Sequence, residues 1–412
     1  MPGDDYDVVV VGARVAGSSL ARQLARAGMR IAVVDRASFP SDTMSTHVVY
    51  PNTIARLERL DALDEIRSHA PPPLYTVWHH AGEAFTAPHT REAGRDWALC
   101  VRRITLDKIL LDCARATGAE VHERFRVTGL LGRGSEEDPV SGVVGELDGC
   151  PRELRAPLVV GADGVRSTVA RLVGAEPHTI MPTETMMLYA YWRDLPTRNC
   201  QEFFFEPPWI GTHFPAEDGF AVVILIGPVE EFDVRTKDRL YRERISSMAT
   251  LGDRLRRGTR VSGVIGTARL GGYYRPPAGP GWLLTGDAGH FKHPAIVQGI
   301  GDALHASEVL APMICEGTQR ERLEPWRDAE TREMYAFSRF AGGVPAAAGM
   351  SEIMAAAIAD AGVARGIVDI WSRAQRPWDV MARVPALLEA AGESPESVFA
   401  SLADGRSASV AA

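Results

Sequence analysis

The chain has 412 residues, which at roughly 100–200 residues per domain allows two or three domains around a substantial core. Hydrophobic residues make up 45% and charged residues 24%, ordinary globular values that argue against a disordered or fibrous protein. With 45 basic and 53 acidic residues the formal net charge is −8, which gives no support to nucleic-acid binding, since that usually requires a basic face.

Membrane and disulfide classes are also disfavoured. No apolar run reaches the roughly 18–20 residues that a membrane-spanning helix needs, so no membrane span is expected. The five cysteines are scattered without a CxxC pair, which predicts neither a zinc site nor a disulfide framework. Residues 1–7 contain three acids and no basic segment, so we expect no secretory signal and a cytoplasmic location.

The N-terminal residues have the pattern of one βαβ unit. A continuous apolar strand, Val8–Val11, leads through a glycine-rich turn into a helix over residues 18–27, and a second strand, Ile31–Val34, follows. Strands without polar alternation are typical of a parallel sheet that is covered on both faces. The pattern therefore predicts such a sheet at the start of the chain.

The glycine-rich turn has the spacing of a dinucleotide fingerprint. Gly12 permits the tight turn, Gly17 lets the helix pack closely on the strand, and the helix N-terminus offers N–H groups to a pyrophosphate. Asp35, 23 residues after Gly12, is placed to accept hydrogen bonds from a ribose. Arg14 replaces the second glycine, so its side chain must turn away from a pyrophosphate or join its contacts. For this motif alone, a structural turn in another α/β protein stays an alternative.

Downstream, helical and strand patterns alternate. Segments rich in aromatic and β-branched residues between positions 183 and 226 favour an antiparallel sheet in a second domain. After residue 320 the sequence is alanine-rich and helical in pattern. Helices are also expected at 54–68, 106–117, 165–173 and 299–313, and strands at 74–86, 120–127, 142–147, 158–161 and 281–285.

Three further motifs follow in order along the chain. Residues 103–110 fit R-x-x-L-D-x-x-L, residues 161–167 fit G-A-D-G-x-x-S, and residues 286–294 fit G-D-A-x-H-x-x-x-P. With these motifs and the glycine-rich turn, residues 6–315 resemble the flavin-dependent monooxygenases of the para-hydroxybenzoate hydroxylase fold and their relatives, the geranylgeranyl reductases and flavin-dependent halogenases. The residues after 320 carry no recognised motif.

The resemblance implies an α/β (α+β mixed) fold in which a Rossmann-like FAD-binding domain is interleaved with an antiparallel-sheet substrate domain. We expect the FAD-binding domain to comprise residues 1–73, 100–180 and 279–320. The substrate domain would comprise residues 74–99 and 181–278, and a C-terminal helical region residues 321–412.

The resemblance also implies one FAD bound in an extended form. The glycine-rich turn would hold the pyrophosphate, Asp35 the adenosine ribose, and the helix start near Gly299 the pyrimidine side of the flavin. The residues expected to contact FAD are Gly12, Val15, Ala16, Gly17, Asp35, Arg36, Arg103, Val127, Asp163, Asp287, Pro294, Gln298, Gly299, Ile300 and Gly301.

Other interpretations of the polar residues stay open. Asp163 and Asp287 could be N-caps of the helices that they precede, a role that Asp fills well. His290 and His293 have the spacing of a metal pair, but a third ligand is missing, so no metal site is expected.

Four residues are weaker candidates for the substrate side of the flavin: His47, Tyr191, Phe205 and His213. His47 lies in the loop where relatives place residues beside the flavin, and it could equally be a histidine of a surface loop. The sheet residues could equally form core, because alternate residues of a strand face away from each other.

The reaction that the resemblance favours is monooxygenation, in which a flavin C4a-hydroperoxide hydroxylates or epoxidises a hydrophobic or aromatic small molecule with O₂ as co-substrate. A second glycine-rich βα turn is missing from the sequence. We therefore expect NAD(P)H to dock transiently as electron donor, or a separate flavin reductase to supply the electrons.

Three alternatives remain. A reductase of the geranylgeranyl reductase type comes first, because Val297 and Gly301 stand where many monooxygenases have Gly and Asn. Halogenation is disfavoured, since the segment W-x-W-x-I-P is missing and no lysine precedes Lys108. A non-catalytic flavin-binding module is the least favoured, because intact FAD motifs usually accompany turnover.

Overall fold

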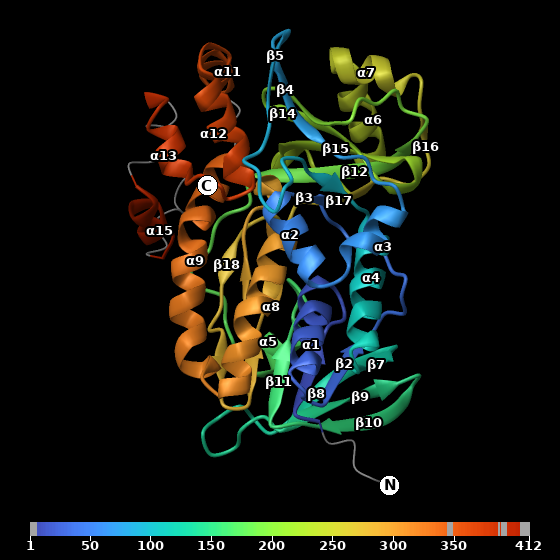
Figure 1. The fold of residues 1–412 in the computed structure, drawn as a ribbon, viewed down its shortest axis with the longest axis vertical. Helices are drawn as coiled ribbons and strands as arrows, with labels where there is room; N and C mark the ends of the chain where they lie inside the picture. The colour runs from blue at the N-terminus through green and yellow to red at the C-terminus, as the bar shows by residue number, and fades with distance from the viewer. Residues whose placement is uncertain (1–5, 344–348, 386–387, 389–393, 404–412) are drawn as a thin grey trace.

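The computed structural model describes residues 6–343, 349–385, 388 and 394–403 of the chain. Two large sheets lie at opposite ends of an elongated molecule, and long helices connect them (Figure 1). The sheet nearer the N-terminus is mostly parallel, whereas the other is mostly antiparallel. This mixed α/β arrangement confirms the predicted fold class.

The first sheet has β1 at its centre. Val8 lies opposite Ile31 on one side and Leu158 on the other, both in parallel register. Val8 and Val10 pack against helices, whereas Val9 packs against a small sheet on the opposite face. Burial on both faces explains why this strand is apolar at every position. The strand order is β19 (Ala278–Gly279), β20 (Trp282–Leu284), β11 (Leu158–Gly161), β1 (Val8–Val11), β2 (Ile31–Asp35) and β7 (Glu120–Glu123).

Helices cover one face of the first sheet, and the small sheet with one short helix covers the other (Figure 1). The helical face holds α1 (Val15–Arg26), α4 (Arg103–Ala116) and α8 (Gly299–Glu316). The other face holds α5 (Thr168–Leu172) and the antiparallel strands β8 (Phe125–Leu131), β9 (Gly142–Leu147) and β10 (Cys150–Arg155).

The second sheet has two differently covered faces. Along β12, Tyr189 and Tyr191 face the rest of the molecule, whereas Leu188 and Ala190 face α6 (Lys237–Ser247) and α7 (Ala249–Leu255). Its strands are β16 (Thr259–Arg260), β12 (Thr185–Arg193), β15 (Phe220–Pro228), β14 (Trp209–Pro215), β13 (Cys200–Glu206), β4 (Tyr75–His80) and β5 (Glu83–Ala87) in that order, with β17 (Ile265–Thr267) paired to β12.

The C-terminal helices lie along one side of the molecule (Figure 1). Helix α9 packs beside α8, and α11 and α12 pack against β5. These helices are α9 (Gln319–Gly342), α11 (Met350–Ala359), α12 (Ala361–Trp371), α13 (Pro377–Met381) and α15 (Pro395–Ala403). The remaining elements are α2 (Pro51–Arg59), α3 (Leu63–Ser68), β3 (Val48–Val49) paired with β6 (Leu99–Cys100), and β18 (Tyr273–Tyr274) paired with β21 (His290–Phe291).

Three predicted elements are interrupted at a residue whose backbone is in the left-handed region of φ and ψ, which few residues other than glycine adopt. The helix predicted at 54–68 is α2 and α3, separated where Asp61 has a φ of 55°. The strand predicted at 74–86 is the β4–β5 hairpin, which turns at Ala81. The strand predicted at 120–127 divides into β7 and β8 at Arg124, whose φ is 59°.

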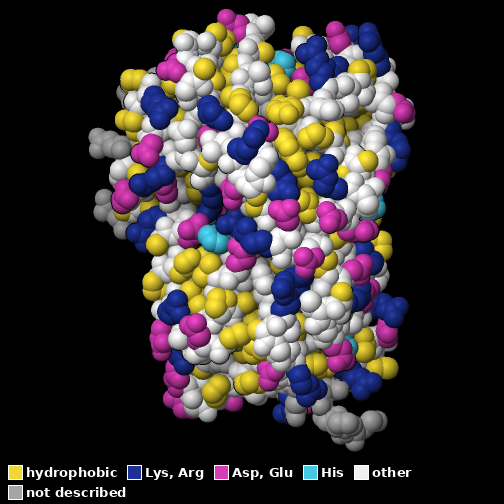
Figure 2. Space-filling model, in the orientation of Figure 1, with side chains coloured by type: hydrophobic (Ala, Val, Ile, Leu, Met, Phe, Trp, Pro, Cys, Tyr) yellow, Lys and Arg dark blue, Asp and Glu magenta, His cyan; other side chains and the backbone are white. Residues whose placement is uncertain are grey.

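No helix in the described ranges is long and apolar enough to cross a membrane. The face drawn in Figure 2 carries acidic and basic side chains side by side, without a basic stripe.

Candidate functional site

The glycine-rich turn lies where the carboxyl ends of β1 and β11 meet. A Cβ on Gly12 would lie 2.4 Å from the carbonyl oxygen of Ala162, and Gly12 has a φ of 108°. A Cβ on Gly17 would lie 1.8 Å from the carbonyl oxygen of Gly12. Both glycines are therefore required for the close approach of turn, helix and neighbouring strand, as the fingerprint predicts. Val15 and Ala16 begin α1 at this turn.

Asp35 ends β2 beside this turn. Its carboxylate accepts hydrogen bonds from the N–H groups of Ala13 and Ala37, each at 2.8 Å. The carboxylate thus fixes both the glycine-rich turn and the loop after β2. Arg36 beside it is exposed, and Val127 is half-buried on β8.

Arg14 turns away from the turn's backbone and joins it to two distant segments. Its guanidinium donates to Asp107 at 2.6 Å and to the carbonyl oxygens of Ser41 at 3.0 Å and Asp42 at 3.1 Å. Asp107, the acid of the second motif, has no exposed side-chain surface and also accepts from Arg103 at 2.8 and 3.0 Å. One buried carboxylate therefore connects the first two motifs and the loop after residue 40.

Asp287 and Arg103 bring the second and fourth motifs together. Burial raises the pKa of Asp287, while the positive charges of Arg103 and Lys292 oppose that shift. The Asp287 carboxylate makes no hydrogen bond or ion pair with any residue in the described ranges. A half-buried carboxylate without a partner carries a large desolvation cost, so it is a natural acceptor for hydroxyl groups of a ligand.

Asp163 behaves differently from Asp287. Its carboxylate accepts from the Ser167 hydroxyl at 2.5 Å and from the N–H of Thr168 at 2.6 Å, while Ser167 caps α5. These contacts are those of a helix N-terminus, the alternative that the sequence left open. Burial nevertheless raises the pKa of Asp163.

The 294–302 turn (residues 294–302) runs from Pro294 into the first turn of α8. Val297 has a φ of 53°, a left-handed conformation that costs a β-branched residue about 1–3 kcal/mol. Glycine, which the family resemblance leads us to expect at this position, would carry no such cost. A Cβ on Gly301 would lie 2.5 Å from Oγ1 of Thr53, so a larger residue here requires the Thr53 hydroxyl to move.

The start of α8 offers free donors. The first intrahelical bond runs from the N–H of Asp302 to Gln298, which leaves the N–H groups of Gly299, Ile300 and Gly301 outside the helix's own bonding. With the helix dipole they favour electronegative groups.

His47 is buried, not a surface loop residue. Its Nδ1 accepts from the N–H of Arg103 at 3.2 Å, and its Nε2 lies 3.3 Å from the hydroxyl of Tyr191. Tyr191 in turn donates to Asp42 at 3.0 Å. Burial, followed by the charges of Arg103 and Arg102, lowers the pKa of His47 to about 3. The ring is therefore neutral at pH 7, with its proton on Nε2 facing Tyr191.

The other two candidates for the substrate side, Phe205 and His213, lie on opposite faces of the second sheet. Phe205 shares the inner face of the second sheet with Tyr191, where it stacks on Trp78 at a ring distance of 4.9 Å. His213 is on the opposite face, with Nδ1 3.4 Å from the buried Glu202 that also pairs with Arg254. His213 is therefore not brought together with His47 and Tyr191.

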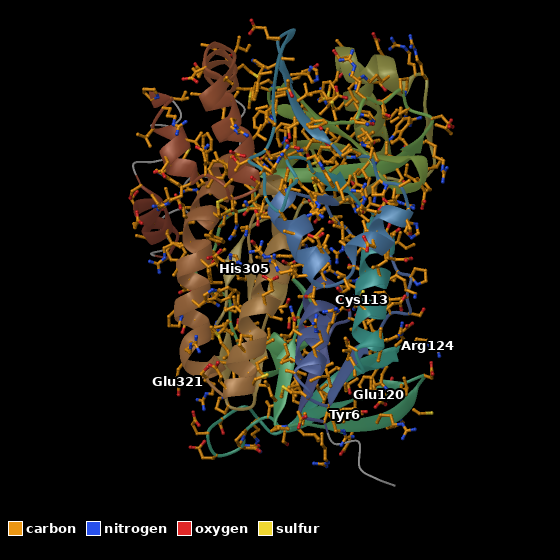
Figure 3. The ribbon with its side chains drawn as sticks, viewed as in Figure 1. Tyr6, Cys113, Glu120, Arg124, His305 and Glu321 are labelled. Atoms are coloured by element: carbon orange, nitrogen blue, oxygen red, sulfur yellow. The ribbon has the colours of Figure 1, made fainter. Side chains whose placement is uncertain are left out.

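The structure adds a cavity that the sequence did not indicate. It has a volume of about 240 Å³ and lies between α2, α8, α9 and the end of α12. His305, labelled on α8 beside α9 in Figure 3, lines it. Its lining residues are Tyr50, Asn52, Thr53, Arg56, Glu92, Val297, Gln298, Gly301, Asp302, His305, Glu330, Trp371, Ser372 and Arg373.

The two motif histidines differ: His293 is hydrogen-bonded on both ring nitrogens, whereas Nε2 of His290 is buried without a hydrogen-bond partner among the described residues. Nε2 of His293 lies 2.9 Å from the Thr185 hydroxyl, and its Nδ1 accepts from the N–H of Ala295 at 3.2 Å. Among the residues that the structure describes, no three His, Cys, Asp or Glu side chains are grouped as metal ligands would be.

The residues present fit FAD. The two glycines leave room that a Cβ would fill, the Asp287 carboxylate lacks a partner within the described ranges, and the start of α8 offers free N–H donors. The family model of the FAD binding domain matches residues 5–332, so the chain belongs to this family. It is a member of the superfamily of FAD-dependent monooxygenases, reductases and halogenases.

Relatives with all three chemistries are found. The menaquinone reductase of Mycolicibacterium smegmatis is 28% identical over 78% of this chain and 79% of its own. The rifampicin monooxygenase of Streptomyces venezuelae is 30% identical over 44% of this chain and 37% of its own. A solved myxobacterial chondrochloren halogenase shares the fold, with a TM-score of 0.73 and 22% identity over 82% of each chain.

Replacing Asp287 should weaken FAD binding. We expect Asp287→Ala to raise the FAD dissociation constant by a few-fold to tens-fold, because a charge-assisted hydrogen bond contributes about 1.5–3 kcal/mol. Asp35→Ala should have a comparable effect, whereas Asp112→Ala on the exposed side of α4 should have none. The measurement is FAD content after dialysis, and equal retention in all four proteins would show that the contacts are misassigned.

His47 should make stability pH-dependent. The unfolded histidine binds a proton below its ordinary pKa of about 6.5, whereas the folded one does so only near pH 3, so stability present above pH 6.5 is lost as the pH falls toward 3. Between pH 7 and pH 5 the wild type should lose about 2 kcal/mol more unfolding free energy than His47→Asn. Asparagine is the replacement because His47 has a φ of 64°, a left-handed conformation that asparagine tolerates. Denaturant titrations at both pH values measure this difference, and equal losses would contradict the buried neutral histidine.

Proposed function

We propose that the protein is an FAD-dependent monooxygenase that hydroxylates or epoxidises a hydrophobic or aromatic small molecule. The observation that carries this proposal is the cavity of about 240 Å³ beside the 294–302 turn. Charged side chains line much of its wall, and the rings of Tyr50 and Trp371 are the part that suits an aromatic substrate. Behind these two rings lies a buried aromatic cluster of Trp78, Phe203 and Phe205. A cavity of this size suits a substrate smaller than a typical drug.

The chain's own residues hold and surround the cofactor in this proposal. FAD supplies the redox chemistry. The glycine-rich turn and Arg103 would hold its phosphates, and Asp287 would accept hydrogen bonds from its hydroxyl groups. His47 and Tyr191 form a buried pair, which would keep water from this side of the cofactor site and so limit side reactions.

The remaining features are proposed on the same basis. NAD(P)H would dock transiently as electron donor, or a separate flavin reductase would supply electrons, and O₂ would be the co-substrate. We assign FAD binding to residues 1–73, 100–180 and 279–320, and substrate binding to 74–99 and 181–278. We expect the protein to act in the cytoplasm.

A flavin-dependent reductase is the second candidate. The observation in its favour is coverage, because the menaquinone reductase matches 78% of this chain whereas the rifampicin monooxygenase matches 44%. Gly301 supports it as well, since the family resemblance places asparagine here in many monooxygenases and the Thr53 hydroxyl would have to move to admit one.

Halogenation is not proposed. The chain has no lysine before Lys108, and the buried amine of Lys292 is held in an ion pair with Asp302. This amine is committed to the protein, whereas the halogenase chemistry needs one that is free to react.

Product analysis separates these reactions. With reduced FAD and ¹⁸O₂, we expect a turned-over compound to gain one labelled oxygen, because oxygen is the group transferred; rifampicin and menaquinone are the first probes, chosen from the relatives' names. The measurement is mass spectrometry with and without O₂, in excess bromide. Gain of two hydrogens without O₂ would establish the reductase instead. A brominated product that disappears in Lys292→Ala would establish a halogenase.

A further inference from the structure

The C-terminal region meets the 294–302 turn through a short segment, the 370–373 segment (residues 370–373). The amide nitrogen of Gln298 donates to the carbonyl oxygens of Ile370 at 3.2 Å and Trp371 at 3.4 Å. The indole N–H of Trp371 donates to the carbonyl oxygen of Ala295 at 3.2 Å. The turn is therefore held at two places by residues more than 70 positions further along the chain.

Arg373 contacts three side chains where the 370–373 segment meets the turn. Its Nε donates to Oε1 of Gln298 at 3.2 Å, one terminal nitrogen lies 2.7 Å from Asp302, and the other donates to Glu330 at 2.6 Å. Only 18% of its side chain is exposed. On the far side of Asp302 stands Lys292 of the fourth motif. Two guanidinium nitrogens donate hydrogen bonds and the third is in ion-pair contact with Asp302, a three-sided arrangement that the single amine of a lysine would not reproduce.

Two residues in this contact have unfavourable backbone conformations. Val297 has a φ of 53° and Arg373 a φ of 58°, and neither is a glycine. Such conformations persist only where the surrounding structure over-determines them. Here the surrounding structure includes the hydrogen bonds of the Gln298 side chain with Ile370, Trp371 and Arg373.

We propose that Arg373 is a positioning residue that imposes the conformation of the 294–302 turn, and that the 370–373 segment is its latch. This inference rests on FAD binding by the turn. Without the latch the turn relaxes, the fraction of molecules with a binding-competent turn falls, and the apparent dissociation constant of FAD rises in proportion. Through the 370–373 segment, the C-terminal helices would therefore contribute to the affinity for FAD.

The test compares Arg373→Gln with Arg376→Gln in apoprotein titrated with FAD. Arg376 is the matched control, because it pairs with Glu333 on the same helix α9 but is 66% exposed and does not reach the turn. We expect Arg373→Gln to raise the FAD dissociation constant at least tenfold and to change the visible flavin spectrum. Arg376→Gln should stay within twofold, and Arg373→Lys should not restore binding.

Rescue by a second substitution separates positioning from general damage. Val297→Gly removes the cost of the left-handed conformation, so the turn no longer depends on the latch. We expect Val297→Gly/Arg373→Gln to bind FAD several-fold more tightly than Arg373→Gln, with Val297→Gly measured as the reference for the double variant. If Arg373→Gln gives no folded protein, Trp371→Phe replaces it in both comparisons; this change removes the bond to Ala295 and part of the ring contacts with Trp78 and Phe337.

The outcomes are decisive in each direction. Equal affinity in Arg373→Gln and Arg376→Gln would overturn the inference, and so would a double variant as weak as the single one. Failure of the wild type itself to bind FAD would overturn the proposed function instead, so the two failures are distinguishable.

Discussion

The buried carboxylate of Asp107 is the interaction on which the site depends. It receives Arg14 from the glycine-rich turn and Arg103 from its own helix, and Arg14 also holds the loop at residues 41 and 42. Removing one partner of a buried ion pair costs about 3–5 kcal/mol, because an uncompensated charge is left behind. The side chain of Arg14, which stands where the fingerprint has its second glycine, therefore joins three segments that would surround the cofactor.

Around this junction several polar groups of the motifs are satisfied within the protein, although Nε2 of His290 is buried without a hydrogen-bond partner among the described residues. Asp35 fixes two backbone N–H groups, Asp163 caps a helix, and His47 is bonded on both ring nitrogens. The carboxylate of Asp287 and the first N–H groups of α8 differ, because they lack partners in the described ranges. Unsatisfied groups of this kind mark where a ligand supplies the missing hydrogen bonds.

Much of this arrangement could be predicted from the sequence, since local patterns carry it. The apolar run of β1, the glycine spacing and the order of the four motifs predicted the fold class, and the left-handed Val297 agrees with the glycine that the family resemblance leads us to expect there. The face on which His213 lies could not be predicted, because alternation along a strand gives two faces without saying which one is inner. The contacts of Arg373 could not be predicted either, since they join residues 43 to 75 positions apart that have no shared motif.

FAD binding is the central claim, and it can be measured directly on the purified protein. We predict a yellow protein with about one non-covalent FAD per chain, which acid or heat releases, because none of its His or Cys residues belongs to a recognised flavin-attachment motif. The measurement is the visible spectrum before and after denaturation, with the released flavin identified by mass. A colourless protein that cannot be reconstituted with FAD would contradict the account.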